Sequence, residues 1–306
     1  MKTRNINFIS ETDGLEISAL EMLPEGEPKA IVQIVHGMCE YKERYLGFAE
    51  FLTERGYAVI THDHRGHGES IKEEGDLGYM YEGSEKGLLM DIRQLQLMAK
   101  KNIGGNLPYY LIGHSMGSLL VRCFVKRFDS LVDKLVVIGS PSKLSGMGAG
   151  LALANVFRLF KGDKGHVKLL DYLVMDMTYE ARFKSENLPH AWVCSDRNVV
   201  EAYNADPKCA YKFTINGYKA LIKTTMDTYS LKGWKVSKPE LPIRFFSGED
   251  DPCAVSREAF EKSVDFMKRV GYKDVEGKMY KGMRHEILNE PNRKIVYEEI
   301  ESFLRK

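Results

Sequence analysis

The sequence predicts an α/β fold around a mostly parallel, doubly wound sheet of about eight strands. Apolar runs such as 30–35 and 57–61 lack the polar alternation of a half-exposed strand, so we expect them to be buried on both faces of the sheet. Segments with helical spacing separate these runs, which gives the strand–helix–strand order typical of parallel sheets. This order breaks from Ser140 to about Thr214, where a helical insertion is expected.

The amino-terminal part of the chain contains most of the expected strands. Two of them, 5–9 and 15–23, are joined by a turn at 12–14, where Gly14 suits a hairpin. Further strands are expected at 30–35, 57–61, 109–112 and 134–138, and helical patterns follow at 43–55, 85–101 and 119–124.

The expected insertion divides the chain into a core of residues 1–140 and 215–306 and a helical cap of residues 141–214. Within the cap, residues 147–160 are rich in Ala, Leu, Val and Phe, and Arg158 is their one charged residue. This segment is interpreted either as a helix packed on its neighbours or as a lid surface that faces lipid or substrate. After the cap we expect a helix at 217–230, a strand at 243–246, a helix between Ser256 and Gly271, a strand at 275–280 and a helix at 293–304.

Composition narrows the classes of function. The 306-residue chain has a formal net charge of +1, so no overall field would attract nucleic acid. Its five cysteines are odd in number and show no C-x-x-C spacing, which favours reduced thiols in a cytoplasmic protein. Neither a secretory signal nor an apolar segment long enough to span a membrane is apparent, so a cytoplasmic location is expected.

The stretch 109–120 carries the clearest catalytic signal. Residues 113–117 read G-H-S-M-G, between a β-type apolar run and a helix-like run. A strand that turns into a helix within a few residues brings two backbones close together, and Gly113 and Gly117 permit that approach. Ser115 is then expected at the N-terminus of a helix, where free amides favour a negatively charged nucleophile.

Two residues that follow later strands complete a catalytic triad in this interpretation. Asp251 and Asp250 both follow the strand at 243–246, and the Gly-x-x-Asp-Pro spacing favours Asp251 as the acid. His285 follows the last strand and is the expected base. The order serine, aspartate, histidine is the one used by α/β hydrolases.

An acyl-transfer site also needs amides that stabilise the oxyanion. One is expected at Met116, directly after the nucleophile, and the second in the loop after the strand at 30–35, at Met38. Only the main chain donates, so both side chains can be methionine.

Taken together, these motifs resemble those of the α/β-hydrolase superfamily, and within it the monoacylglycerol lipase and lysophospholipase group. The resemblance implies the triad Ser115, Asp251 and His285, oxyanion amides at Met38 and Met116, a helical lid over an acyl pocket, and no cofactor or metal. Ser118 stands where that family often has a further glycine. The motifs that carry the resemblance are H-G-M-C-E at 36–40 with Arg44-Tyr45, D-H-R-G-H-G-E-S at 63–70, G-H-S-M-G at 113–117, Asp206-Pro207 and R-H-E at 284–286.

The expected function is therefore hydrolysis of carboxylic esters through an acyl-enzyme, with a monoacyl lipid ester as substrate. The cap would make transient contact with a membrane surface. An esterase or peptidase acting on small non-lipid substrates is the alternative within the same chemistry, and a ligand-binding protein without turnover is the alternative from another class.

A further alternative comes from the H-x-H-x-x-H spacing of His62, His64 and His67, which could gather a metal ion as in metallo-β-lactamase-like hydrolases. The position before His67 is Gly66, where that motif would have aspartate. In the hydrolase interpretation this loop is structural, and Asp63 and Arg65 are expected to pair near its base.

Overall fold

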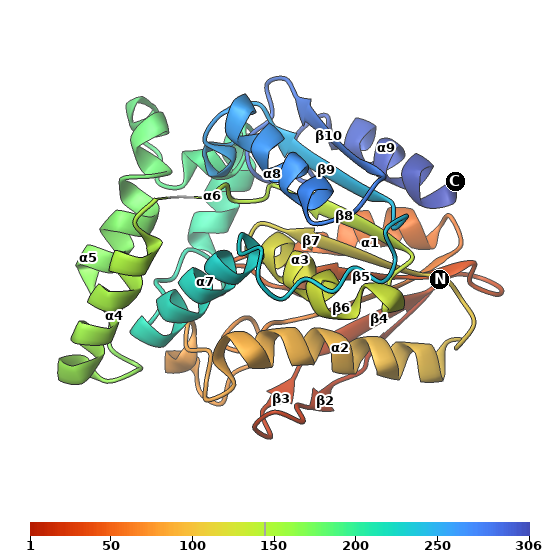
Figure 1. Ribbon diagram of the computed structural model, residues 1–306, viewed down its shortest axis with the longest axis horizontal. Coiled ribbons are helices and arrows are strands. Elements are labelled where there is room, and N and C mark those ends of the chain that lie inside the picture. Colours follow the sequence, from red (N-terminus) through yellow and green to blue (C-terminus); the bar gives the residue numbers. More distant parts are fainter. Residues whose placement is uncertain (144) are drawn as a thin grey trace.

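The computed structural model describes residues 1–143 and 145–306, and its centre is an eight-stranded sheet (Figure 1). The two pairings of β4, with β1 and with β6, are antiparallel, and the remaining neighbours are parallel. The predicted fold class is confirmed. In spatial order the strands are β1 (Lys2–Asn5), β4 (Ala19–Leu23), β6 (Tyr57–His62), β5 (Ala30–Val35), β7 (Tyr109–His114), β8 (Lys134–Ile138), β9 (Ile243–Gly248) and β10 (Val275–Tyr280).

The amino-terminal strands differ from the prediction of two continuous strands. Residues 5–9 and 15–23 are each divided, so that β2 (Phe8–Ile9) and β3 (Glu16–Ile17) pair in a separate small sheet. The break at Ser18 has a tertiary cause, since the backbone N–H of Ser18 donates to the Ser70 hydroxyl (2.9 Å) and not to a neighbouring strand. Ser10 in turn donates its hydroxyl to Asp91 (2.6 Å), which ties the small sheet to the helix carrying that carboxylate.

Helices cover both faces of the sheet and create two cores. α1 (Leu46–Thr53) and α9 (Arg293–Arg305) pack on one face, where Phe48 and Ile300 belong to one buried cluster. On the other face lie α2 (Ser84–Asn102), α3 (Met116–Phe128), α7 (Ile215–Thr228) and α8 (Arg257–Arg269), which contribute to the larger cluster. Ser256 caps the N-terminus of α8 as predicted, because its side chain accepts a hydrogen bond from the backbone N–H of Ala259.

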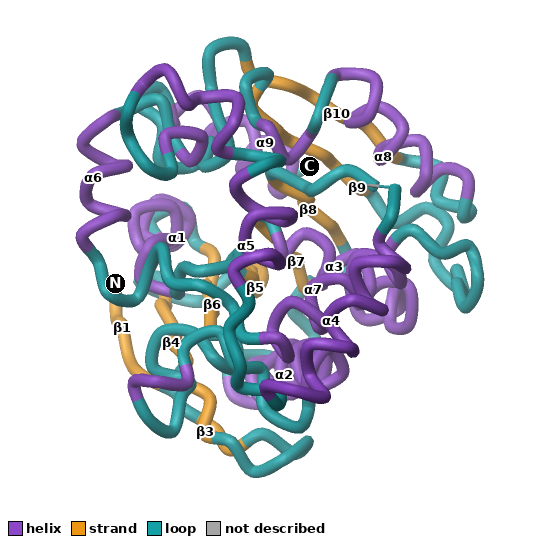
Figure 2. Tube along the Cα trace, turned by 90° about the vertical axis from the view of Figure 1, so that its left-hand side faces the viewer, coloured by secondary structure: helices purple, strands orange, loops and turns teal. Residues whose placement is uncertain are grey.

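The segment between β8 and α7 contains helices and turns and, among its described residues, no strand. It comprises α4 (Met147–Lys161), α5 (Lys168–Asp171), a π-helical turn at 172–176 and α6 (Arg197–Ala205), joined by short 3-10 turns. Position 144, within the predicted cap, lies outside the described residues. In Figure 1 this segment projects on the left of the molecule, and in Figure 2 its helices lie in front of the strand ends. The helix expected at 147–160 is α4.

In the described parts of the chain, no helix is both long enough and apolar enough to cross a bilayer.

Candidate active site

Ser115 occupies a strained turn between β7 and α3. Its backbone angles are φ 53° and ψ −120°, a region that residues with a side chain rarely adopt. The flanking glycines make the turn sterically feasible. A Cβ on Gly117 would lie 2.1 Å from the carbonyl oxygen of Val35, and one on Gly113 would lie 2.4 Å from the carbonyl oxygen of Gly117. Ser115 therefore lies at the carboxyl end of a central strand, at the start of a helix, as the sequence predicted.

Asp251 and His285 meet at the same edge of the sheet. Nδ1 of His285 lies 3.0 Å from both carboxylate oxygens of Asp251. The backbone N–H of Cys253 (2.9 Å) and the Ser247 hydroxyl (3.2 Å) donate to this carboxylate as well. Burial raises the pKa of Asp251, but His285, the N–H of Cys253 and the charge of His114 outweigh that effect and hold the pKa below its usual value.

The neighbouring Asp250 is placed differently. Its side chain is exposed and lies 3.4 Å from the guanidinium of Arg182 at the surface. Of the two candidate acids, only Asp251 contacts the histidine, in agreement with the Gly-x-x-Asp-Pro register.

The other predicted residues converge on the same place. Ser115, His285, Met38 and Met116 all line one cavity of about 40 Å³. The loop after β5 approaches Ser115 so closely that a Cβ on Gly37 would lie 2.8 Å from its Cβ. The structure therefore brings the sequence-predicted residues together at one edge of the sheet.

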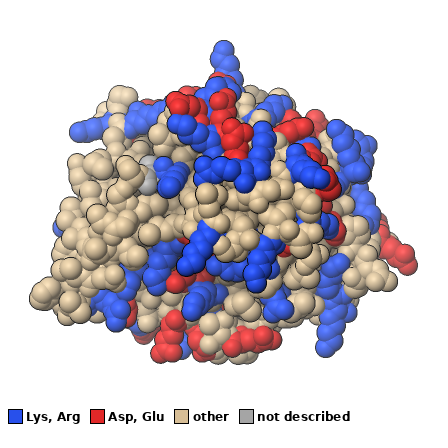
Figure 3. Space-filling model, in the orientation of Figure 1, with Lys and Arg blue, Asp and Glu red and all other residues tan. Residues whose placement is uncertain are grey.

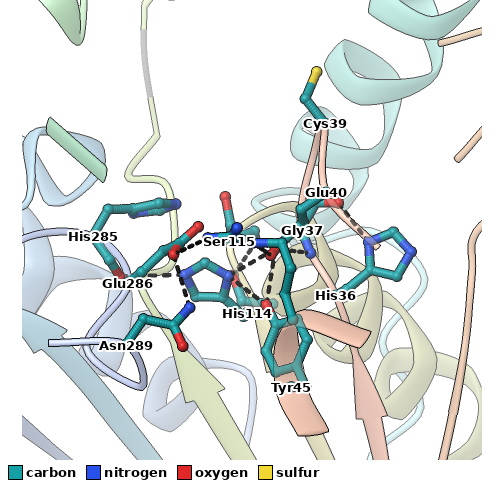
Figure 4. Close-up of polar contacts among 12 residues, drawn as sticks. His36, Gly37, Cys39, Glu40, Tyr45, His114, Ser115, His285, Glu286 and Asn289 are labelled. Atoms are coloured by element: carbon teal, nitrogen blue, oxygen red, sulfur yellow. Dashed lines mark hydrogen bonds and ion pairs between the residues drawn. The ribbon is translucent and has the colours of Figure 1, made fainter. Parts of the chain in front are cut away.

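A buried polar cluster that was not predicted from the sequence lies behind Ser115 (Figure 4). Oε1 of Glu40 accepts from the N–H of Gly37 (2.5 Å) and from the hydroxyl of Tyr45 (2.8 Å), and it lies 3.0 Å from Nδ1 of His114. Nε2 of His114 lies 3.2 Å from the carbonyl oxygen of His285. This cluster joins the loop after β5, the end of β7 and the loop that carries His285.

The charges of the cluster follow from these contacts. Burial raises the pKa of Glu40, but the hydrogen bond and charge of His114 lower it more, so the net pKa lies well below the usual value. For His114, burial lowers the pKa and Glu40 raises it, with a net increase. A protonated His114 can donate from Nδ1 to Glu40 and from Nε2 to the His285 carbonyl, which satisfies both ring nitrogens.

A second buried ion pair lies beside this cluster. Arg44 contacts Glu286 at 2.5 Å, and Asn289 donates to the same carboxylate (2.8 Å). The backbone N–H of Glu286 donates to the carbonyl of Val193 (2.8 Å), so the loop after His285 is attached to the segment between β8 and α7. The motifs that carried the family resemblance include Glu40, Arg44, Tyr45 and Glu286. The spacing of these residues in the sequence did not predict which side chains they would contact.

The histidines of the loop at 62–70 lie near one another, but in the described residues their donor atoms do not form a group of three converging ligands. The ring centroids of His62 and His64 lie 5.0 Å apart, and those of His64 and His67 lie 5.9 Å apart. Across the described residues, the group of three potential metal ligands with converging donor atoms is elsewhere and contains none of them.

The expected pairing of Asp63 with Arg65 is wrong. Asp63 pairs with Nζ of Lys42 (2.7 Å), whereas Arg65 reaches Asp91 (2.9 Å) and Asp13 (2.6 Å). Each of the two side chains finds a buried counter-charge on a different element of the fold.

Comparison with known proteins gives the family. A family model described as serine aminopeptidase, S33, matches residues 26–292, and the chain belongs to this family of hydrolases. The resemblance to the α/β-hydrolase superfamily that its motifs indicated is thereby confirmed.

Particular relatives cover nearly the whole chain. A monoacylglycerol lipase of Mycolicibacterium smegmatis is 29% identical over 312 residues, covering 99% of this chain and 97% of that protein. Phospholipase YtpA of Bacillus subtilis is 24% identical over 282 residues, covering 90% and 95%. Among solved structures, a highly thermostable carboxyl esterase from Bacillus coagulans, in complex with glycerol, has a TM-score of 0.90 at 25% identity over 100% of this chain and 98% of that one.

The Glu40–His114 pair predicts a pH-dependent contribution to stability. The pKa of His114 is raised in the folded state, so its contribution is complete below the ordinary value of 6.5 and is lost as pH rises through the folded value. The lowered pKa of Glu40 makes its contribution complete above 4.5. We expect His114→Asn to lower the free energy of unfolding by about 3 kcal/mol at pH 6 and by less at pH 9, measured by urea denaturation.

The exposed His166 provides a matched control for this experiment. His166→Asn should change the free energy of unfolding little at either pH. An equal loss for His114→Asn at pH 6 and pH 9 would show that the pair is not ionised in the folded protein.

Proposed function

We propose that this protein is a serine hydrolase that cleaves monoacylglycerols through an acyl-enzyme. The observation that carries the proposal is the strained Ser115 turn in one cavity with His285, whose imidazole is paired with the buried Asp251. In this arrangement Ser115 attacks the ester carbonyl while Nε2 of His285 takes its proton. Asp251 holds the Nδ1–H tautomer and stabilises the imidazolium that forms.

The remaining steps use the same groups in reverse roles. The protonated His285 donates its proton to the leaving alcohol and, in the second half of the reaction, activates water against the acyl-enzyme. The backbone amides of Met38 and Met116 would hold the oxyanion. Within the described chain neither amide donates to another residue, and that of Met116 lies at the N-terminus of α3.

An apolar cavity suits an acyl chain. It has a volume of about 460 Å³ and lies between α4, the π-helical turn and α7. Pro141, Val174, Tyr179 and Leu221 line both this cavity and the one that contains Ser115. The proposed cap, residues 141–214, would thus supply one wall of a continuous acyl path.

The part of the cavity that would hold the leaving alcohol favours a substrate whose alcohol is uncharged. The carboxylates of Glu40 and Glu286 line the cavity that contains Ser115. Their charges are matched by His114 and Arg44, so no cation is left over in this cluster to pair with a phosphate. Glycerol fits this environment better than the phosphate-bearing alcohol of a lysophospholipid.

The cap also presents an apolar surface to solvent, which we propose makes transient contact with a lipid surface. Leu159 and Phe160 at the end of α4 are 81% and 82% exposed. Figure 3 shows a broad uncharged area on this side of the molecule. Arg158, Lys161 and Lys164 lie nearby in the sequence and could contact anionic headgroups.

Substitution of the two adjacent aspartates tests the triad. We expect Asp251→Asn to reduce kcat on a soluble ester by about 10⁴-fold, because asparagine favours the wrong tautomer of His285. Asp250→Asn should leave kcat within a few-fold of wild type, because that side chain contacts only Arg182 at the surface. The reverse ranking would place the acid at Asp250.

A substrate series tests the acyl and alcohol assignments. We expect kcat/KM for 1-monoacylglycerols to rise with acyl length as the apolar cavity fills. Lysophosphatidylcholine of the same acyl length should be cleaved more slowly, and aminoacyl p-nitroanilides should not be cleaved. A preference for acetyl esters would contradict the lipase assignment but not the triad, and cleavage of the anilides would indicate a peptidase.

Substitutions on the exposed surface of the proposed cap distinguish an effect on lipid contact from an effect on the chemical step. The double variant Leu159→Ser/Phe160→Ser should lose activity several-fold on monoacylglycerol presented in micelles and keep its rate on a soluble short ester. Leu231→Ser is a matched control, because Leu231 is 55% exposed but lies outside the proposed cap. Equal losses on both substrates would show that the apolar surface stabilises the cap rather than contacting lipid.

A further inference from the structure

One side chain beside the proposed triad takes no part in the mechanism. Cys253 lies in the short turn after Asp251, and its Sγ is 4.0 Å from Nε2 of His285. Asp251, Cys253 and His285 each offer a donor atom, and these three atoms all lie within 4.8 Å of one another. In the described residues this is the group of buried side chains whose spacing suits a metal ion.

The carboxylate prepares the imidazole for metal binding as well as for catalysis. Asp251 accepts from Nδ1 of His285 and so leaves the lone pair on Nε2. Metal-binding histidines in proteins commonly have this arrangement, in which a carboxylate holds the ring nitrogen that is not coordinated. The Nε2 atom whose lone pair would remove the Ser115 proton can therefore also serve as a metal ligand, 4.0 Å from the thiol of Cys253.

We propose that Cys253 and His285 together bind a soft divalent cation such as Zn²⁺, which reversibly inhibits the enzyme. Zn²⁺ binds thiolate sulfur at about 2.3 Å and imidazole nitrogen at about 2.0–2.1 Å, which in a tetrahedral site separates the two donors by roughly 3.6 Å. The observed 4.0 Å needs to shorten by only about 0.4 Å, within the reach of a side-chain adjustment.

The binding step is a proton exchange. Zn²⁺ forms a bond to Sγ of Cys253, the thiol proton is released to solvent, and no electron is transferred. Nε2 of His285 binds the same ion, so it can no longer accept the proton of Ser115. Water fills the remaining coordination positions from the cavity that both side chains line.

Aromatic side chains surround the proposed metal site. The indole of Trp192 lies 5.1 Å from the ring of His285, and the ring of Tyr179 lies 5.0 Å from that of Trp192. These aromatic side chains cover the histidine and leave a cavity of only about 40 Å³. That space can hold the ion together with its coordinated water.

Zinc titration of the purified protein tests this proposal. In a buffer that does not bind metals, ZnCl₂ should inhibit hydrolysis of a soluble ester, and EDTA should restore the full rate. Cys253→Ser and Cys253→Ala should each raise the half-inhibitory zinc concentration by about 10- to 100-fold, with inhibition expressed relative to each variant's own metal-free rate. Cys123→Ser, which changes a buried thiol between α3 and α7, should keep wild-type sensitivity.

A spectroscopic measurement makes the result independent of hydrolysis. Co²⁺ added to the Ser115→Ala variant should produce a thiolate-to-cobalt charge-transfer band that is absent in Ser115→Ala/Cys253→Ser. The proposal is overturned if millimolar zinc does not inhibit wild type, if Cys253→Ser is inhibited as strongly as wild type, or if the cobalt band persists without Cys253.

Discussion

The Glu40 carboxylate is the contact on which the geometry of the site depends. It accepts hydrogen bonds from Gly37 in the loop after β5 and from Tyr45, and it pairs with His114 at the end of β7. His114 in turn reaches the carbonyl of His285. The buried Glu40–His114 ion pair thus fixes three elements that are far apart in the sequence. These elements carry the proposed oxyanion amide, nucleophile and base. Breaking such a pair leaves a buried charge uncompensated, so the arrangement has few alternatives.

The parallel sheet explains why these groups meet at all. Ser115, Asp251 and His285 each follow the carboxyl end of a strand, and β7, β8, β9 and β10 are successive neighbours. The strain at Ser115 is tolerated because β7 and α3 are held by extensive packing on both sides. The segment between β8 and α7 then covers this edge, and its Trp192 and Val193 carbonyls accept from the N–H groups of His285 and Glu286.

Much of this could be predicted from the sequence because it depends on local pattern. Apolar runs in the sequence predict the buried strands, and the G-x-S-x-G motif between a strand and a helix predicts the turn at 113–117. The amino-terminal strands were predicted as continuous because the hydrogen bond from Ser18 to Ser70 depends on a residue far along the chain. For the same reason the partners of Glu40, His114 and Arg65 could not be predicted. Which charges pair across a fold is decided by tertiary contacts that spacing does not encode.

Covalent labelling tests most directly whether Ser115 is a nucleophile activated by this geometry. Wild-type protein treated with a fluorophosphonate should gain one adduct, and peptide mapping by mass spectrometry should place it on Ser115. Ser115→Ala, shown to be folded by circular dichroism, should gain none. An adduct on another residue, or no adduct on folded wild-type protein, would contradict the account and favour a protein that binds ligands without turnover.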